Sequence, residues 1–202
     1  MNGRAPQRRN RFLRRGGRDP NRLARHGKKV MPQSYFALFN LEPRFALPGE
    51  QLDAAYRQLA AQVHPDRYAN AAPAEQRLAL SLATSANEAY RTLKRPLLRA
   101  QHLLGLRGVD VLDGGARISQ EFLLEQMDWR ETLSDARAAR NATGLQQLGE
   151  LVRRRTADLL QQLAAQLDAD GDNCAAARTV QQLMYVDKLL FDIDEAHALL
   201  EA

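Results

Sequence analysis

The sequence predicts an all-α protein, with a small helical unit at the N-terminal side and a bundle of three helices at the C-terminal side. Alanine, leucine, glutamine, arginine and glutamate, which favour helices, are abundant, while β-branched residues are scarce and aromatic residues make up only 6%. Apolar residues also recur at helical spacing along most of the chain. With 202 residues, the protein can bury one ordinary core or two small ones.

Charge is divided unevenly along the chain. Residues 1–30 contain eleven Lys or Arg and one acid, Asp19, whereas the remaining 172 residues contain 18 basic and 23 acidic residues. The basic segment has no hydrophobic periodicity, so it cannot bury enough apolar surface to offset the entropy lost on ordering. We therefore expect residues 1–30 to be a disordered basic extension of an otherwise acidic protein.

Several classes of protein are disfavoured. A lone Cys174 forms neither an internal disulfide nor a cysteine metal site, and it favours a reducing, cytoplasmic location. No apolar run approaches the roughly 20 residues that span a bilayer, so we expect a soluble protein without a membrane partner. His26, His102 and His197 lack neighbours at ligand spacing and are expected to be solvated or packed. No nucleophile and base pair or phosphate loop appears, so neither an enzyme nor a cofactor is expected.

The first half predicts a helical hairpin flanked by short helices. A short apolar helix is expected over residues 34–41, and a longer one opens at Pro48 and ends near Val63, because a proline disfavours helical geometry at the residue before it. The packing face of the longer helix comprises Leu52, Ala55, Tyr56, Leu59 and Val63. Its outward face comprises Arg57, Gln58, Ala61 and Gln62.

A third helix is expected between Pro73 and Pro96, packed antiparallel on the second, with residues 97–104 continuing helically. Its predicted packing stripe comprises Leu78, Leu82, Ala86, Ala89, Tyr90 and Leu93. This arrangement places the tripeptide His64-Pro65-Asp66 at the closed end of the hairpin. The simpler interpretation is that Pro65 only ends a helix and Asp66 only caps a turn.

The second half predicts an antiparallel bundle of three helices. Residues 105–115 are rich in glycine and aspartate and form the expected boundary. Helices are expected over about 119–139, 144–168 and 172–200, with a capping box from Thr143 to Gln146 and a cap at Asp172.

The helix over 119–139 has two opposed apolar zones. Phe122, Trp129, Leu133 and Ala136 share one narrow sector and suit the core. The far side carries Leu124, Met127, Asp128, Glu131 and Asp135, with Leu123 at its edge. An exposed apolar surface rimmed by acids is typical of a protein-binding site. From the residues alone, burial of both sides in a three-helix bundle is nearly as favourable.

Four segments resemble J-domain proteins. YRQLAAQVHPDR over 56–67 and NEAYRTL over 87–93 resemble the second helix, loop and third helix of J domains. YFALF over 35–39 and RPLLRA over 95–100, followed by Leu103 and Leu104, are closer to the HscB family. The resemblance covers residues 31–202. It implies a J domain over 31–106, a linker over 107–118 and a scaffold-binding three-helix domain over 119–202.

By this resemblance, the protein is a co-chaperone that delivers an iron-sulfur scaffold protein of the IscU type to a DnaK-class chaperone of the HscA type and stimulates the ATPase of that chaperone. The implied chaperone-binding residues are His64, Pro65, Asp66, Arg57 and Arg67. The implied scaffold-binding residues are Leu123, Leu124, Met127, Asp128, Glu131, Asp135 and Tyr185. Gln58, Ala61 and Gln62 depart from the more basic helix of many J domains, which predicts weak or selective chaperone binding.

Two other functions stay open. The first half is equally compatible with a J-domain protein that serves a different client. A nucleic-acid-binding helical protein is permitted by the basic extension but disfavoured by the acidic remainder. The extension itself has three interpretations: an arm for nucleic acid or anionic surfaces, a transit-like presequence, or residues added by too early a start codon. We favour the third, because Met31 directly precedes the segment that resembles HscB.

Overall fold

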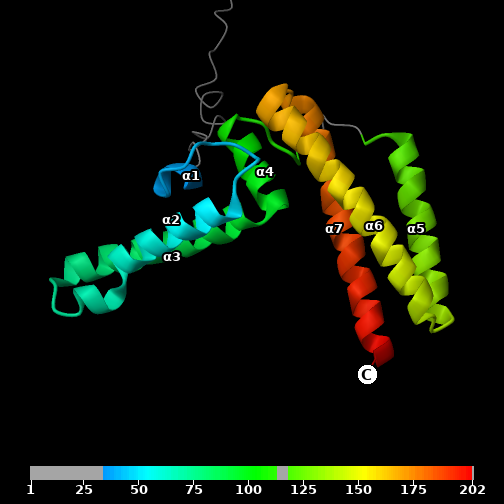
Figure 1. The fold of residues 1–202 in the computed structure, drawn as a ribbon, viewed down its shortest axis with the longest axis horizontal. Coiled ribbons are helices and arrows are strands. Elements are labelled where there is room, and N and C mark those ends of the chain that lie inside the picture. Colours follow the sequence, from blue (N-terminus) through cyan, green and yellow to red (C-terminus); the bar gives the residue numbers. More distant parts are fainter. Residues whose placement is uncertain (1–33, 113–117, 202) are drawn as a thin grey trace, which may run out of the picture. The chain divides into compact units, whose positions relative to one another are not determined.

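The computed structural model describes residues 34–112 and 118–201, and every regular element within these ranges is helical (Figure 1). The predicted all-α class is therefore confirmed for this part of the chain. The prediction for the basic extension over 1–30 lies outside the described residues. Among the helices in these ranges, none combines the length and hydropathy that crossing a membrane requires.

The N-terminal half contains four helices and one short turn of 3-10 helix. They are α1 (Tyr35–Leu38), α2 (Gly49–Val63), the 3-10 helix η2 (Pro65–Tyr68), α3 (Pro73–Lys94) and α4 (Pro96–Leu106). The hydroxyl of Ser34 caps α1 by accepting from the Ala37 backbone N–H. Asn40 then adopts a positive φ of 53°, which ends the helix well before residue 41, where the sequence prediction placed its end.

The predicted packing face of α2 is confirmed. Leu52 and Val63 are buried, and Ala55, Tyr56 and Leu59 are half-buried, whereas Arg57, Gln58, Ala61 and Gln62 are exposed. The rings of Tyr56 and Tyr90 stack across the hairpin with centroids 4.3 Å apart. Asp53 then accepts hydrogen bonds from the Tyr90 hydroxyl at 3.0 Å and from Lys94 at 2.6 Å. These contacts hold the end of the hairpin opposite the loop.

The predicted stripe on α3 is wrong in its first two turns. Leu78 and Leu82 are exposed, and Ala79 is buried instead. The covered side of α3 carries Ala79, Ala86 and Ala89, whereas Leu82 lies beside α1, where it lines a cavity with Tyr35 and Leu38. Burial agrees with the prediction from Ala86 onward.

The C-terminal half contains three long helices. They are α5 (Gln120–Ala138), α6 (Ala142–Ala164), which continues into the π-helical segment η3 (Ala165–Ala169), and α7 (Asn173–Glu201). The predicted capping box from Thr143 to Gln146 is wrong, because α6 starts earlier and the Asn141 side chain accepts from the Gly144 N–H at 2.9 Å. The predicted cap at Asp172 is confirmed by its bond from the Ala175 N–H at 2.9 Å. No pattern in the sequence predicted η3.

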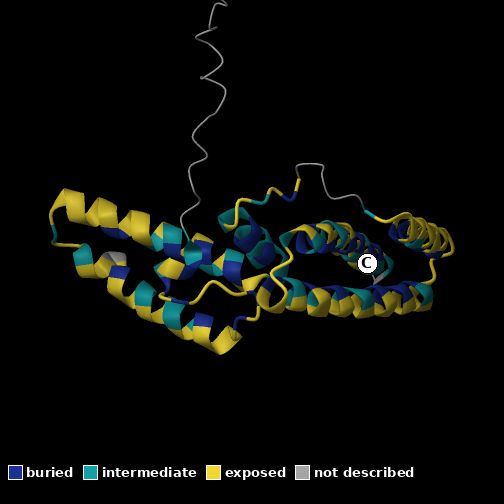
Figure 2. Cartoon of the chain, turned by 90° about the horizontal axis from the view of Figure 1, so that it is seen from above, coloured by how far each residue is buried: buried dark blue, intermediate teal, exposed yellow. Residues whose placement is uncertain are grey.

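One apolar core runs through both halves, from Phe36 to Ala196, and α4 packs on α7. Figure 2 shows buried residues on the facing sides of α6 and α7 and exposed residues on their outer sides. Part of the expected linker is also packed, since Val111 is buried and its carbonyl accepts from Gln181 at 2.6 Å. The division into domains over 31–106 and 119–202 remains a prediction.

Candidate protein-binding surfaces

The loop between α2 and α3 displays polar side chains at the end of the hairpin, and we call residues 64–67 the hairpin tip. The side chains of His64 and Asp66 are 59% and 89% exposed. His64 leaves helical geometry with φ −60° and ψ 130°, because the ring of Pro65 crowds a helical residue before it. His64 and Asp66 are thus presented to solvent by a chain reversal that the sequence itself imposes.

Local hydrogen bonds hold the tip in one conformation. The Nδ1 atom of His64 accepts from the Asp66 backbone N–H at 3.3 Å, so in the neutral ring the donor is Nε2–H. Arg67 donates to the Ala61 carbonyl at 3.2 Å and Tyr68 to the Gln62 carbonyl at 3.4 Å. These bonds satisfy carbonyls that the end of α2 leaves without helical partners.

The tip carries positive charge close to an exposed acid. Arg67 stays exposed while it bonds Ala61, and Arg57 lies on the outward face of α2. The guanidinium groups of Arg67 at the tip and of Arg57 two helical turns before it suit a negatively charged partner surface through charge-assisted hydrogen bonds. In the described ranges, no group of three or more His, Cys, Asp or Glu side chains could hold a metal ion.

On α5 the two apolar zones are separated as predicted. Phe122, Trp129, Leu133 and Ala136 are buried, whereas Leu123, Leu124 and Met127 are 45%, 52% and 64% exposed. The three acids Asp128, Glu131 and Asp135 are exposed as well. We call these six exposed residues the α5 surface. The alternative that α5 buries both of its sides is wrong, because α6 and α7 both lie behind the Trp129 side.

Tyr185 of α7 lies close to the start of α5. It is 46% exposed and lines a cavity of about 390 Å³ together with Ile118, the residue two before α5. Leu112, Gln181, Met184 and Lys188 complete the lining. Apart from Tyr185, the sequence did not point to the residues that line this cavity. Ile118 could have been found, because an apolar residue directly before a helix cap, here Ser119, is a recognised signal for packing at a helix start.

The α5 surface has a clear physical use. Large apolar side chains left in water forgo about 1.5–3 kcal/mol each relative to full burial, so a partner that covers them gains affinity. Methionine adapts its shape to such a partner, and the acidic rim favours a basic one. The arrangement suits protein recognition.

On the core side of α5, the sequence did not predict one buried polar residue, Gln126. Gln126 is 6% exposed, and neither its amide nitrogen nor its oxygen has a hydrogen-bond partner within the described part of the chain. An amide left without partners in a core carries a desolvation cost of about 1–3 kcal/mol. The core side of α5 therefore carries one polar side chain among its apolar residues.

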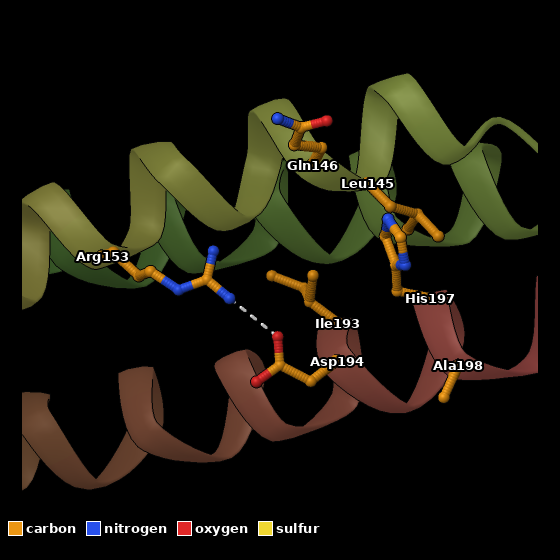
Figure 3. Close-up of a pocket in the computed structure, with 7 residues that line it drawn as sticks. All are labelled: Leu145, Gln146, Arg153, Ile193, Asp194, His197 and Ala198. Carbon is orange, nitrogen blue, oxygen red and sulfur yellow. Dashed lines mark hydrogen bonds and ion pairs between the residues drawn. The ribbon is translucent and has the colours of Figure 1, made fainter. Parts of the chain in front are cut away.

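A second cavity, of about 300 Å³, lies between α6 and α7 (Figure 3). Its apolar wall is formed by Leu145, Ile193 and Ala198, and an ion pair of 2.8 Å joins Arg153 to Asp194 at its edge. The charges of Arg153 and Asp194 are therefore already paired with each other. None of the residues predicted for binding lines this cavity.

The expectation of a packed histidine holds at His102. Its Nε2 accepts from the Tyr35 backbone N–H at 3.1 Å, and its ring stacks on that of Tyr35 with centroids 4.4 Å apart. Burial lowers the pKa of His102 and so favours the neutral ring. His102 thus anchors α1 to α4.

Comparison with known proteins finds one matching family model and relatives that match most of the chain. The family described as "HSCB C-terminal oligomerisation domain" matches residues 118–194. The co-chaperone protein HscB homolog of Azoarcus sp. (strain BH72) is 44% identical over 85% of this chain and 97% of its own length. The homolog of Burkholderia multivorans is 45% identical over 81% and 93%. Chaperone HscB from Vibrio cholerae, a solved structure, is 34% identical with a TM-score of 0.73, covering 83% of this chain and 99% of its own.

Proposed function

Because the chain belongs to the HscB family of co-chaperones, we propose that it binds an iron-sulfur scaffold protein of the IscU type, delivers it to a DnaK-class chaperone of the HscA type and stimulates the ATPase of that chaperone. The protein would thereby assist iron-sulfur cluster transfer in the bacterial cytoplasm. ATP hydrolysis would belong to the chaperone, and this chain would perform no chemistry.

One observation carries the proposal: two exposed surfaces of opposite chemistry lie on different helices of one chain. The hairpin tip is polar and partly basic, and the α5 surface is apolar with an acidic rim. A protein that brings two partners together needs two such surfaces, and their different chemistry lets each select its own partner.

At the tip, we assign chaperone binding to His64, Pro65, Asp66, Arg57 and Arg67. The Nε2–H of His64 offers a donor and the Asp66 carboxylate offers an acceptor, and the bond from the Asp66 N–H to Nδ1 fixes the orientation of the His64 ring. Because this geometry exists before binding, little conformational entropy is lost when a partner docks.

On the bundle, we assign scaffold binding to Leu123, Leu124, Met127, Asp128, Glu131, Asp135 and Tyr185. The leucines and Met127 would supply apolar contact area, and the acids would orient a basic scaffold surface. Tyr185 contributes a ring with a polar hydroxyl, which is common at protein interfaces.

The decisive measurement is the steady-state ATPase rate of an HscA-type chaperone, with and without this protein and with and without the scaffold. We expect stimulation by the protein alone and further stimulation when the scaffold is added. His64→Gln should reduce the stimulation by about tenfold or more, because a bond to the partner is lost from a fixed position. Gln147→Ala, at an exposed position on α6, is the matched control and should behave as the parent.

The outcomes separate the alternatives. Stimulation of the chaperone without any effect or binding of the scaffold would identify a J-domain protein for another client. Failure to stimulate, together with binding of DNA or RNA by residues 31–202, would contradict the proposal and favour a nucleic-acid-binding protein.

A further inference from the structure

The end of α6 departs from regular helix at a place where distant parts of the chain meet. Residues Ala165–Ala169 form the π-helical segment η3, with the Asp170 N–H bonded to the Ala165 carbonyl at 2.9 Å. Short π-helical segments are rare and frequently mark functional positions, because the wider turn redirects side chains and carbonyls. No role of the proposed binding surfaces requires this segment.

The carboxylate of Asp168 in η3 accepts two hydrogen bonds from the loop between α1 and α2. Its Oδ1 accepts from the Phe45 backbone N–H and its Oδ2 accepts from the Ala46 backbone N–H, both at 2.7 Å. Two short, charge-assisted bonds to consecutive amides form a bidentate contact, which fixes direction as well as distance. The contact joins residues more than 120 positions apart in sequence.

The same segment also holds the end of α4. Arg107 donates through Nη2 to the Leu167 carbonyl at 3.0 Å and through Nη1 to the Asn173 side chain at 2.9 Å. Leu167 is buried in the common core. The region around η3 therefore binds two separate segments of the N-terminal half, one on each side of the hairpin in sequence.

Asp168 also balances a half-buried charge. The Arg99 guanidinium lies over the Phe45 ring at 5.1 Å and donates to the Leu93 carbonyl at 2.8 Å, while its buried Nε has no partner among the described residues. Burial lowers the pKa of Arg99, and the Asp168 charge opposes that lowering. Loss of the carboxylate would thus weaken the packing of Arg99 on Phe45 as well as the two amide bonds.

We propose that Asp168 is a positioning residue that fixes the hairpin to the α5-α6-α7 bundle, so that the chaperone at the tip and the scaffold on α5 are held in one relative arrangement. The inference rests on the proposed function. A fixed arrangement lets binding at one surface assist the event at the other, because the two partners do not have to be oriented anew.

Asp168 can be replaced without opening a cavity in the apolar core. Its residue is exposed, and the core around Leu167 does not include its side chain. Asp168→Asn keeps the size but provides one acceptor oxygen, and its amino group would face a backbone N–H. Asp170→Asn, an exposed change two residues along, is the matched control.

The first test measures the arrangement itself. Spin labels at Gln58→Cys and Gln147→Cys, in a Cys174→Ser background of the full chain, report the distance between α2 and α6 by pulsed electron paramagnetic resonance. We expect one narrow distance distribution for the parent and Asp170→Asn and a broadened one for Asp168→Asn. A distribution that stays narrow in Asp168→Asn overturns the inference.

The second test measures coupling through the chaperone ATPase. Asp168→Asn should leave the affinity for each single partner within about twofold of the parent and reduce the additional stimulation caused by the scaffold by about fivefold. Unchanged additional stimulation, or a parallel loss of both single affinities, overturns the inference. If the parent itself fails to stimulate the chaperone, the proposed function fails, while the distance measurement still decides whether Asp168 fixes the arrangement.

Discussion

The hairpin tip and the α5 surface are both exposed, but different forces create them. The tip is exposed because Pro65 ends a helix and nearby backbone and side-chain bonds close the reversal within a few residues. The α5 surface is exposed because the opposite side of the same helix, with Phe122 and Trp129, is taken up by the core. The comparison teaches that a polar recognition site can be built locally, whereas an exposed apolar site depends on distant packing.

The largest expected effect tests this dependence on α5 itself. Trp129→Ala should lower the free energy of unfolding by about 3–5 kcal/mol, because it empties part of the core. Met127→Ala, two residues away on the exposed side, should change it by no more than about 0.5 kcal/mol. Urea unfolding followed by far-ultraviolet circular dichroism measures both free energies. Tryptophan fluorescence does not serve here, because Trp129 is the only tryptophan and one of the variants lacks it. Equal losses for the two variants would contradict the separation of faces.

The next effect separates the two surfaces by function. Leu124→Ser combined with Met127→Ser should weaken scaffold binding by about 3 kcal/mol, or roughly a hundredfold, because about two large apolar contacts are lost. Stimulation of the chaperone without scaffold should persist. Isothermal titration calorimetry and the ATPase assay measure the two quantities, with Leu199→Ser as an exposed apolar control on α7. Simultaneous loss of both activities would mean misfolding or a wrong assignment of the surface.

Opposite charge on the two surfaces predicts that each charge assists association with only one of the two partners. Arg57→Gln should slow association with the chaperone a few-fold, and Glu131→Gln should slow association with the scaffold by a similar factor, because each removes one steering charge. Both effects should diminish strongly near 1 M salt, where the screening length is about 3 Å. Stopped-flow association rates at low and high salt provide the measurement. An effect of either variant on the other partner would count against two independent surfaces.

The smallest expected effect concerns pH and is confined to the N-terminal half. Burial lowers the pKa of His102, so below its ordinary pKa of about 6.5 the unfolded chain takes up a proton more readily than the folded one. The stability that the neutral ring provides is complete above that pH and decreases as pH falls from there through the folded pKa.

Hydrogen exchange of the α1 amides checks this directly. After correction for the intrinsic rate, exchange should become faster as the pH is lowered from 7.5 to 5.5. The reason is that a protonated His102 ring cannot accept the hydrogen bond from the Tyr35 backbone N–H. The amides of α5 should show no such change. His102→Gln should remove most of the pH dependence, whereas His64→Gln, at an exposed ring, should retain it.

Most of the helical boundaries could be predicted, because short-range rules set them. Pro48 precedes α2, Pro65 follows its end and Pro96 opens α4, each through the steric demands of the proline ring. Asp172 was identified as a cap from its position before an apolar run. The start of α6 was misplaced, because two capping residues lie two positions apart and sequence alone does not rank Asn141 above Thr143.

The candidate surfaces were predictable to different degrees. Exposure of the tip followed from its place in a hairpin. Helical periodicity grouped the six residues of the α5 surface on one side of the helix, but it was compatible both with exposure of that side and with its burial. Periodicity groups residues onto a face, but it does not reveal which face another helix covers. The same limit explains the error at Leu78 and Leu82, since periodicity does not reveal that the covered side of α3 carries Ala79 and Ala86.

By itself, the sequence determined the all-α class, the order of the helices and the reversal at His64, since these depend on propensity and sterics within a few residues. Only the tertiary structure decided which side of α5 stays in water, that Gln126 is buried, and that Asp168 reaches the amides of Phe45 and Ala46. Those outcomes depend on which distant segments meet, and contacts across more than 100 residues leave no periodic signal in the chain.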